Sequence, residues 1–166
     1  MAIVGRLFRF AVVLVLLVLM FGIGWAVGRL GYGSTVPVAS LADREREFAD
    51  RMKNSSLVGH FTVAGRERRS AEEERYDISS VEKVADDRWR FNVRMRHGSF
   101  DVTMPVVVPV KWVDNTPVVT MTDWNIPSLG TFTCYVLFAG DRYTGTWQHG
   151  PVGGLMYGRI EKQAQP

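Results

Sequence analysis

The sequence predicts a mainly β protein: an N-terminal transmembrane helix, a short amphipathic helix, and then one antiparallel, barrel-like domain of about eight strands. Three observations lead to this prediction. Residues 10–27 carry no charged side chain. From residue 57 onward, hydrophobic side chains alternate with polar ones at period two. Glycine- and aspartate-containing turns interrupt that alternation at short intervals. We therefore divide the chain into a tail and anchor (1–29), a linker with a helix (30–55) and a β domain (56–162).

The apolar run at 10–27 predicts a membrane anchor. About 18 residues at a rise of ~1.5 Å form a helix of roughly 27 Å, which nearly crosses the hydrocarbon core of a bilayer. Arg6 and Arg9 precede the run, and a short basic tail favours the cytoplasmic side, which places the β domain outside the cytoplasm. The alternative is a secretory signal, cleaved after the small residues at 26–28. Because the run exceeds the roughly 7–15 apolar residues of a signal, we favour the anchor.

The charge distribution argues against nucleic acid as a partner. The net charge is +3, yet all seventeen acidic residues lie at Asp43 or beyond. Three of the twenty basic residues flank the apolar run: Arg6, Arg9 and Arg29. The other seventeen lie in the rest of the chain. The extramembrane part is therefore formally neutral and lacks the basic surface that phosphate binding requires. Cys134 is the single cysteine, so no intrachain disulfide can hold the domain.

Between the anchor and the strands, the sequence predicts a linker and one short helix. Gly28–Ala39 contains glycines and a proline without periodicity. Ser40 then resembles a helix cap, with Asp43 three residues later. In the segment 41–52, apolar side chains that include Phe48 and Met52 share one face. We expect this face to pack on its own domain, with the membrane surface or a partner as alternatives.

The strands follow from alternation and from the turns between them. The clearest is 88–96, where Trp89, Phe91 and Val93 alternate with polar residues. The full set of predicted strands is 57–63, 76–84, 88–96, 100–112, 118–124, 131–138, 142–148 and 155–160. Pro105 and Pro109 predict that 100–112 is an edge strand or a bent one. The connections are too short for crossover helices, so we expect an antiparallel meander that forms a barrel or a sandwich.

Two short patterns resemble known proteins. Gly59-His60-Phe61 places a glycine two residues before an aromatic in the first strand, and Gly145-Thr146-Trp147 repeats that spacing. This pattern resembles the opening of lipocalin-like barrels. The segment 141–160 resembles the C-terminal part of a family of uncharacterised, membrane-anchored bacterial proteins. The resemblance implies a lipocalin-like, calycin-type architecture without an assigned activity.

Aromatic side chains are the candidates for ligand binding. Trp89, Phe91, Trp112, Tyr143 and Trp147 point inward if the strand phases are right. In a small barrel such residues either fill the interior or line a cavity for an apolar ligand. A filled core is the default, because eight-stranded barrels can be filled by side chains alone.

No motif predicts catalysis, a cofactor or a metal. The three histidines His60, His97 and His149 lie far apart in the sequence, without the close spacing of zinc ligands. Barrel closure could still bring His60 and His149 together. The carboxylate clusters Glu72–Glu74 and Asp86–Asp87 are interpreted as loop and turn residues. No nucleophile elbow, phosphate loop or dinucleotide fingerprint is present.

We therefore expect a single-pass, membrane-anchored β module without catalytic activity, which binds an apolar small ligand or a component of the cell envelope. The alternative is a structural or assembly protein that acts through protein–protein contacts. A hydrolase with a site assembled from distant residues is the least favoured hypothesis. The sequence leaves the oligomeric state open.

Overall fold

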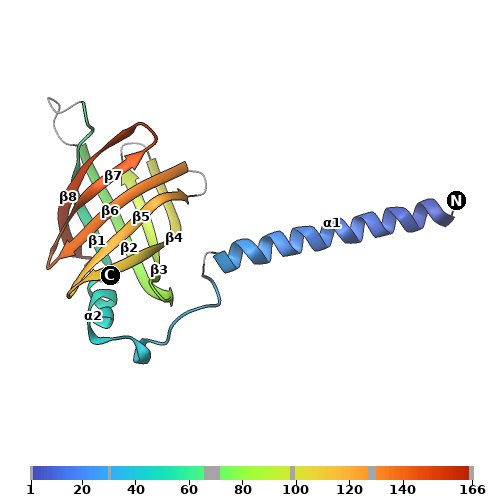
Figure 1. Ribbon diagram of the computed structural model, residues 1–166, viewed down its shortest axis with the longest axis horizontal. Coiled ribbons are helices and arrows are strands. Elements are labelled where there is room, and N and C mark those ends of the chain that lie inside the picture. The colour runs from blue at the N-terminus through green and yellow to red at the C-terminus, as the bar shows by residue number, and fades with distance from the viewer. Residues whose placement is uncertain (1, 30, 66–71, 98–99, 127–129, 165–166) are drawn as a thin grey trace. The chain divides into compact units, whose positions relative to one another are not determined.

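The computed structural model describes residues 2–29, 31–65, 72–97, 100–126 and 130–164 (Figure 1). The chain forms two compact units, Met1–Ser34 and Thr35–Pro166. The first unit contains the helix α1 (Ala2–Arg29). Its segment Arg9–Arg29 has a mean hydropathy of 2.8 and is long and apolar enough to cross a membrane. A signal sequence near the N-terminus would meet the same criteria.

The second unit is a closed, eight-stranded antiparallel β-barrel (Figure 1). Each strand pairs with the next one in the sequence, and β8 pairs with β1 to close the wall. The strands are β1 (Ser55–Phe61), β2 (Glu72–Ala85), β3 (Arg88–His97), β4 (Phe100–Val113), β5 (Thr116–Ile126), β6 (Gly130–Ala139), β7 (Arg142–His149) and β8 (Val152–Lys162). The predicted fold class is thus confirmed, and of the two architectures considered, the barrel is the one that forms.

The two ends of the barrel differ. The helix α2 (Asp43–Met52) precedes β1 and lies at the end where the turns 86–87, 114–115 and 140–141 connect the strands (Figure 1). We call this the α2 end. The opposite end, where β1, β3 and β7 finish, is called the far end. Every strand crosses between these two ends, so each inward-facing side chain has a defined depth along the barrel.

The helix α2 begins later than predicted. A 3₁₀ turn, η1 (Val38–Ser40), precedes it, and the Ser40 hydroxyl donates to the carbonyl of Pro37 (2.8 Å) instead of capping α2. The carboxylate of Glu45 accepts from the backbone amide of Ala42 (3.3 Å) at the start of the helix. The predicted Ser40 cap is therefore wrong, because Ser40 satisfies the preceding turn.

The apolar face of α2 packs on its own domain, as predicted. Phe48 and Met52 are both fully buried. The Lys83 ammonium on β2 pairs with Glu45 at 2.6 Å, and Arg44 donates to the Asp114 carbonyl at the β4–β5 turn (3.1 Å). These polar contacts hold the helix across the end of the barrel, so that its apolar side chains point into the interior.

The strand β4 is not an edge strand. It lies between β3 and β5 in a closed wall, so the prediction of an edge from Pro105 and Pro109 is wrong in that sense. Its ladder with β3 runs from Phe100 to Pro109, whereas its ladder with β5 is confined to Val110–Val113. The two prolines thus lie in the stretch of β4 that has no register partner in the described part of β5.

Candidate functional site

The part of the interior nearest the α2 end is filled with aromatic rings. Phe48 of α2 lies edge-on to Trp89 (5.6 Å between ring centroids), Phe91 (6.2 Å) and Trp112 (5.9 Å). Trp89 is 0% exposed, and its indole Nε1 has no hydrogen-bond partner among the described residues. Three of the five predicted ligand-binding residues therefore surround a side chain of the protein itself.

One row of residues crosses four strands obliquely, from the second residue of β7 near the α2 end to the third residue of β2 near the far end. Tyr143 on β7 is in register with Gly158 on β8, Gly158 with Gly59 on β1, and Gly59 with Glu74 on β2. Because neither glycine has a side chain, the Tyr143 ring lies across both strands, and its hydroxyl donates to Oε1 of Glu74 (2.9 Å). A Cβ atom on Gly59 would lie 2.5 Å from the Tyr143 oxygen, so the row requires glycine there.

Glu74 is a buried carboxylate in this row, with 5% of its surface exposed. Its Oε2 accepts a second phenol, that of Tyr76, at 2.8 Å. Burial, followed by the proximity of Glu74, raises the pKa of both Tyr76 and Tyr143 well above the ordinary value of a phenol. The phenols therefore remain protonated donors at neutral pH. The interpretation of Glu72–Glu74 as loop residues is wrong, since β2 begins at Glu72.

Toward the far end, several inward-facing side chains are only partly buried. Trp147 packs edge-on against Phe61 (5.6 Å), and its indole nitrogen donates to the carbonyl of Thr62 (3.1 Å). Met95 and Met121 are also partly buried and pack against the core. The far half of the interior is therefore less tightly enclosed than the half beneath α2.

Sulfur-containing side chains are concentrated in this far half. The inward-facing methionines are Met95, Met104, Met121 and Met156, and Met121 is in register with Cys134. Methionine is flexible and polarizable, so a lining of this kind adapts to different shapes. Cys134 is buried, and burial raises the pKa of its thiol to about 12. The thiol is protonated at neutral pH and does not behave as a nucleophile.

The outer wall has a hollow of its own. A depression of about 770 Å³ lies over β6, β7, β8 and β1, and residues such as Val58, His60, Thr144, Tyr157 and Arg159 line it. The rings of His60 and Tyr157 stack at 6.1 Å. Toward the far end, the outer wall beside this depression carries few charged side chains. Tyr135, Leu155 and Tyr157 expose 44%, 56% and 47% of their surfaces there.

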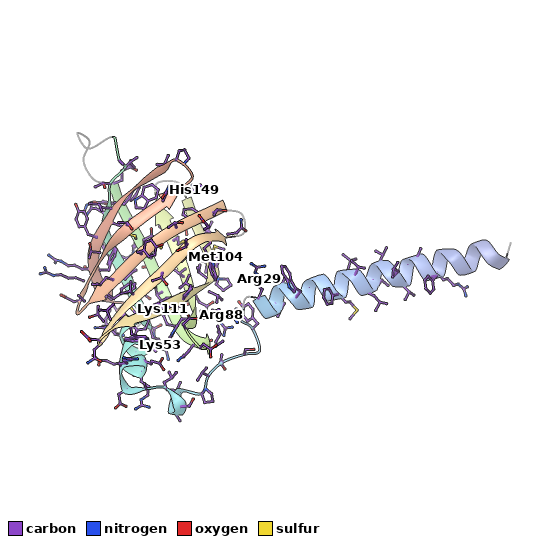
Figure 2. All side chains as sticks on the ribbon, in the orientation of Figure 1. Arg29, Lys53, Arg88, Met104, Lys111 and His149 are labelled. Carbon is purple, nitrogen blue, oxygen red and sulfur yellow. The ribbon has the colours of Figure 1, made fainter. Side chains whose placement is uncertain are left out.

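The described histidine side chains lie apart from one another. His60 stacks on Tyr157, whereas His149 stacks on Phe132 (4.3 Å) at the far end (Figure 2). The side chain of His97 lies outside the described residues. Among the residues whose placement is described, no group of three or more His, Cys, Asp and Glu side chains could hold a metal ion.

The predicted ligand-binding residues are thus spread along the barrel. Trp89, Phe91 and Trp112 surround Phe48 beneath α2, Tyr143 lies near the start of β7, and Trp147 lies toward the far end of that strand. Phe48, Phe61 and Glu74 are not among the residues predicted from the sequence. Glu74 could have been found by extending the alternation of Tyr76 and Ile78 two residues backward.

Comparison with models of known families, with curated proteins and with solved structures found no match to this chain. The geometry of the barrel is therefore the basis for a functional assignment.

Proposed function

We propose that this protein is a membrane-anchored, extracytoplasmic binding module that takes an apolar small ligand into the far half of its barrel. The helix α1 serves as the single-pass anchor, and the β domain lies outside the cytoplasm. Arg6 and Arg9 before the apolar segment support this orientation, since cytoplasmic flanks are enriched in basic residues.

The observation that carries the proposal is the change in packing along the barrel. Trp89 and Phe48 are fully buried at the α2 end, whereas Phe61, Met95 and Trp147 are only partly buried at the other. Apolar pockets with adaptable side chains and a few fixed polar groups are typical of small-molecule sites. Here the Glu74 carboxylate and its two phenols supply the polar groups.

The closed, eight-stranded antiparallel barrel is also the architecture that the lipocalin resemblance implies, and barrels of this size can hold one small ligand. We include an envelope component with an apolar part among the ligands. The ligand does not extend to the α2 end, because the aromatic side chains there are packed against Phe48.

Binding can be tested with N-phenyl-1-naphthylamine, an uncharged fluorophore that brightens in apolar surroundings. We expect the full chain in detergent to bind it with energy transfer from Trp147. Met95→Trp, which places an indole in the far half, should weaken binding by about tenfold or more, a loss of about 1.4 kcal/mol. The matched control Thr146→Trp adds the same bulk to the outer face. Equal binding by both variants, or none by the parent chain, would contradict the proposal.

Orientation can be tested with a cysteine on the outer wall. Thr144→Cys introduces an exposed thiol, and Cys134 is buried, so a membrane-impermeant maleimide reports on position 144 alone. We expect labelling in right-side-out membrane vesicles and protection in inverted ones. The reverse pattern would place the barrel in the cytoplasm, and recovery of the labelled chain without its first residues in the soluble fraction would indicate a cleaved signal.

The outer wall supports a second candidate function, that of an assembly protein. Tyr135 on β6 and Leu155 and Tyr157 on β8 are large side chains left substantially exposed on either side of β7, and apolar patches of this kind mark protein interfaces. A photo-crosslinking residue at Leu155, incorporated in the full membrane-embedded chain, should then yield one discrete adduct. Leu155→Asp should abolish that association while the barrel still binds the fluorophore, and recovery of monomer alone would exclude this candidate.

A further inference from the structure

The ladder between β4 and β5 is shorter than any other described ladder of the closed barrel. Among the described residues, register pairs join the two strands from Val110–Val113 to Thr116–Val119. On the other side of Val110, β4 continues for ten residues along β3, and β5 continues to Ile126 along β6. Within the described part of the chain, an unpaired stretch therefore lies between residues 103–109 of β4 and residues 120–126 of β5. We call this stretch the seam.

Prolines keep the seam from closing. The Val110 amide donates to the carbonyl of Asp87 (2.7 Å), on the β3 side of the strand. Successive amides of a strand point to opposite sides, and the β3–β4 register has no shift. The nitrogens of Pro109 and Pro105 therefore face β5. Since proline has no N–H, neither Pro109 nor Pro105 can donate a ladder hydrogen bond to β5.

The seam borders the far half of the interior. Met104 on β4 is in register with the inward-facing Val93, and Met121 on β5 with the inward-facing Cys134. Both methionines thus point inward at the two borders of the seam, and both are partly buried. A route through the α2 end is blocked by Phe48 and its aromatic neighbours.

We propose that the seam is the entrance through which an unbranched acyl chain passes into the far half of the barrel. This inference rests on the proposed binding function and specifies its ligand class and route. A gap along two strands is long and narrow, so it admits a flexible chain lengthwise more readily than a bulky ring system. The methionine side chains at its borders can rotate aside, because they have three rotatable bonds and no branch.

The route can be tested by linking the two borders. Thr103→Cys and Thr122→Cys place exposed thiols on β4 and β5, and a bis-maleimide then bridges the seam. The matched control bridges Arg94→Cys and Thr103→Cys, two positions already in register on β3 and β4. The probe is cis-parinaric acid, a fluorescent acyl chain, with rates measured by stopped flow on the full chain in detergent.

Bridging the seam should slow association and dissociation of the probe by about tenfold or more, which corresponds to a barrier of about 1.4 kcal/mol, and should leave the equilibrium affinity nearly unchanged. The control bridge should change neither. Equal rates for both bridges, with binding intact, overturn the seam as the route but leave the binding function standing. Absence of probe binding in the unmodified chain overturns both.

A second variant tests the role of the prolines. Pro105→Val with Pro109→Val restores two amides toward β5, so we expect slower hydrogen exchange in residues 120–125 and slower entry of the probe. Pro151→Ala, in the β7–β8 turn, is the control for loss of a proline elsewhere. Unchanged exchange and unchanged entry rates in the double variant would show that the prolines do not hold the seam open.

Discussion

The hydroxyl of Tyr143 donates a hydrogen bond of 2.9 Å to Glu74 although two strands separate β7 from β2. The contact exists because both intervening strands contribute a glycine at this level. It ties four of the eight strands together inside the barrel. A buried carboxylate is costly unless donors satisfy it, so this one hydrogen bond matters more than its length alone indicates.

Removing the donor should therefore destabilise the barrel. We expect Tyr143→Phe to lower the free energy of unfolding by about 1–3 kcal/mol, because it withdraws a hydrogen bond from the buried carboxyl group of Glu74. Urea denaturation of the chain measures the loss. The matched control is Tyr157→Phe, whose hydroxyl lies on the exposed outer wall. A loss as large in the control as in Tyr143→Phe would show that the buried row has no special role.

The glycine beneath the Tyr143 ring should not tolerate a methyl group. A Cβ atom on Gly59 would lie 2.2 Å from the Tyr157 carbonyl oxygen and 2.5 Å from the Tyr143 hydroxyl. We expect Gly59→Ala to cost about 1–3 kcal/mol through overpacking, measured by the same denaturation. Val58→Ala alters the neighbouring, outward-facing position. If Gly59→Ala is the milder of the two, the close approach described for this row is not maintained in solution.

Truncating the side chain that fills the α2 end should both destabilise the barrel and open it. Phe48→Ala removes a fully buried ring, and such truncations cost about 3–5 kcal/mol. We also expect additional binding of N-phenyl-1-naphthylamine at the α2 end, in the space that the Phe48 ring leaves. Glu47→Ala, an exposed neighbour on the same helix, should change neither quantity. Unaltered stability of Phe48→Ala would mean that α2 does not seal the barrel.

The barrel should lose stability in alkaline solution. Burial raises the pKa of Cys134 from 9.0 to about 12, so the folded chain holds a proton that the unfolded chain releases. The contribution of Cys134 to the free energy of unfolding is complete below about pH 9. It declines as the pH rises toward 12, because the unfolded state then binds fewer protons than the folded state. Tyr76 and Tyr143 add to the same trend, as their pKa values are raised too.

This decline can be assigned with Cys134→Ala. The free energy of unfolding, measured between pH 8 and 11, should fall less steeply in the variant than in the parent chain, because one raised pKa is absent. Coincident slopes would indicate that the thiol is accessible to water in the folded state.

Local sequence patterns predicted the strands well, because alternation of side chains is a local property. The strand predicted at 88–96 is β3, Arg88–His97, and the amphipathic stripe containing Phe48 does pack on the barrel. The closure of the wall could also be predicted from the sequence, since short turns leave few topologies for eight strands. The fold class therefore followed from period, turn spacing and connection length.

The candidate site was harder to predict from the sequence, because its contacts join distant parts of the chain. Glu74 appeared as one member of an acidic run, and only its register with Gly59 places it inside the barrel. Likewise, Pro105 and Pro109 indicated a missing strand partner, but the sequence does not say on which side. That side is set by the phase of the β3–β4 ladder, which depends on a partner strand and not on β4 alone.

The pairing of β1 with β8 has a practical consequence for handling the protein. Ser55 and Lys162 are in register, and Lys162 donates to the carbonyls of Asp50 and Lys53 in the segment that leads into β1. Both ends of the β domain thus leave from the same pole. A fluorescent protein, affinity tag or surface linker fused after Gln163 would sit at that pole and leave the opposite rim unobstructed.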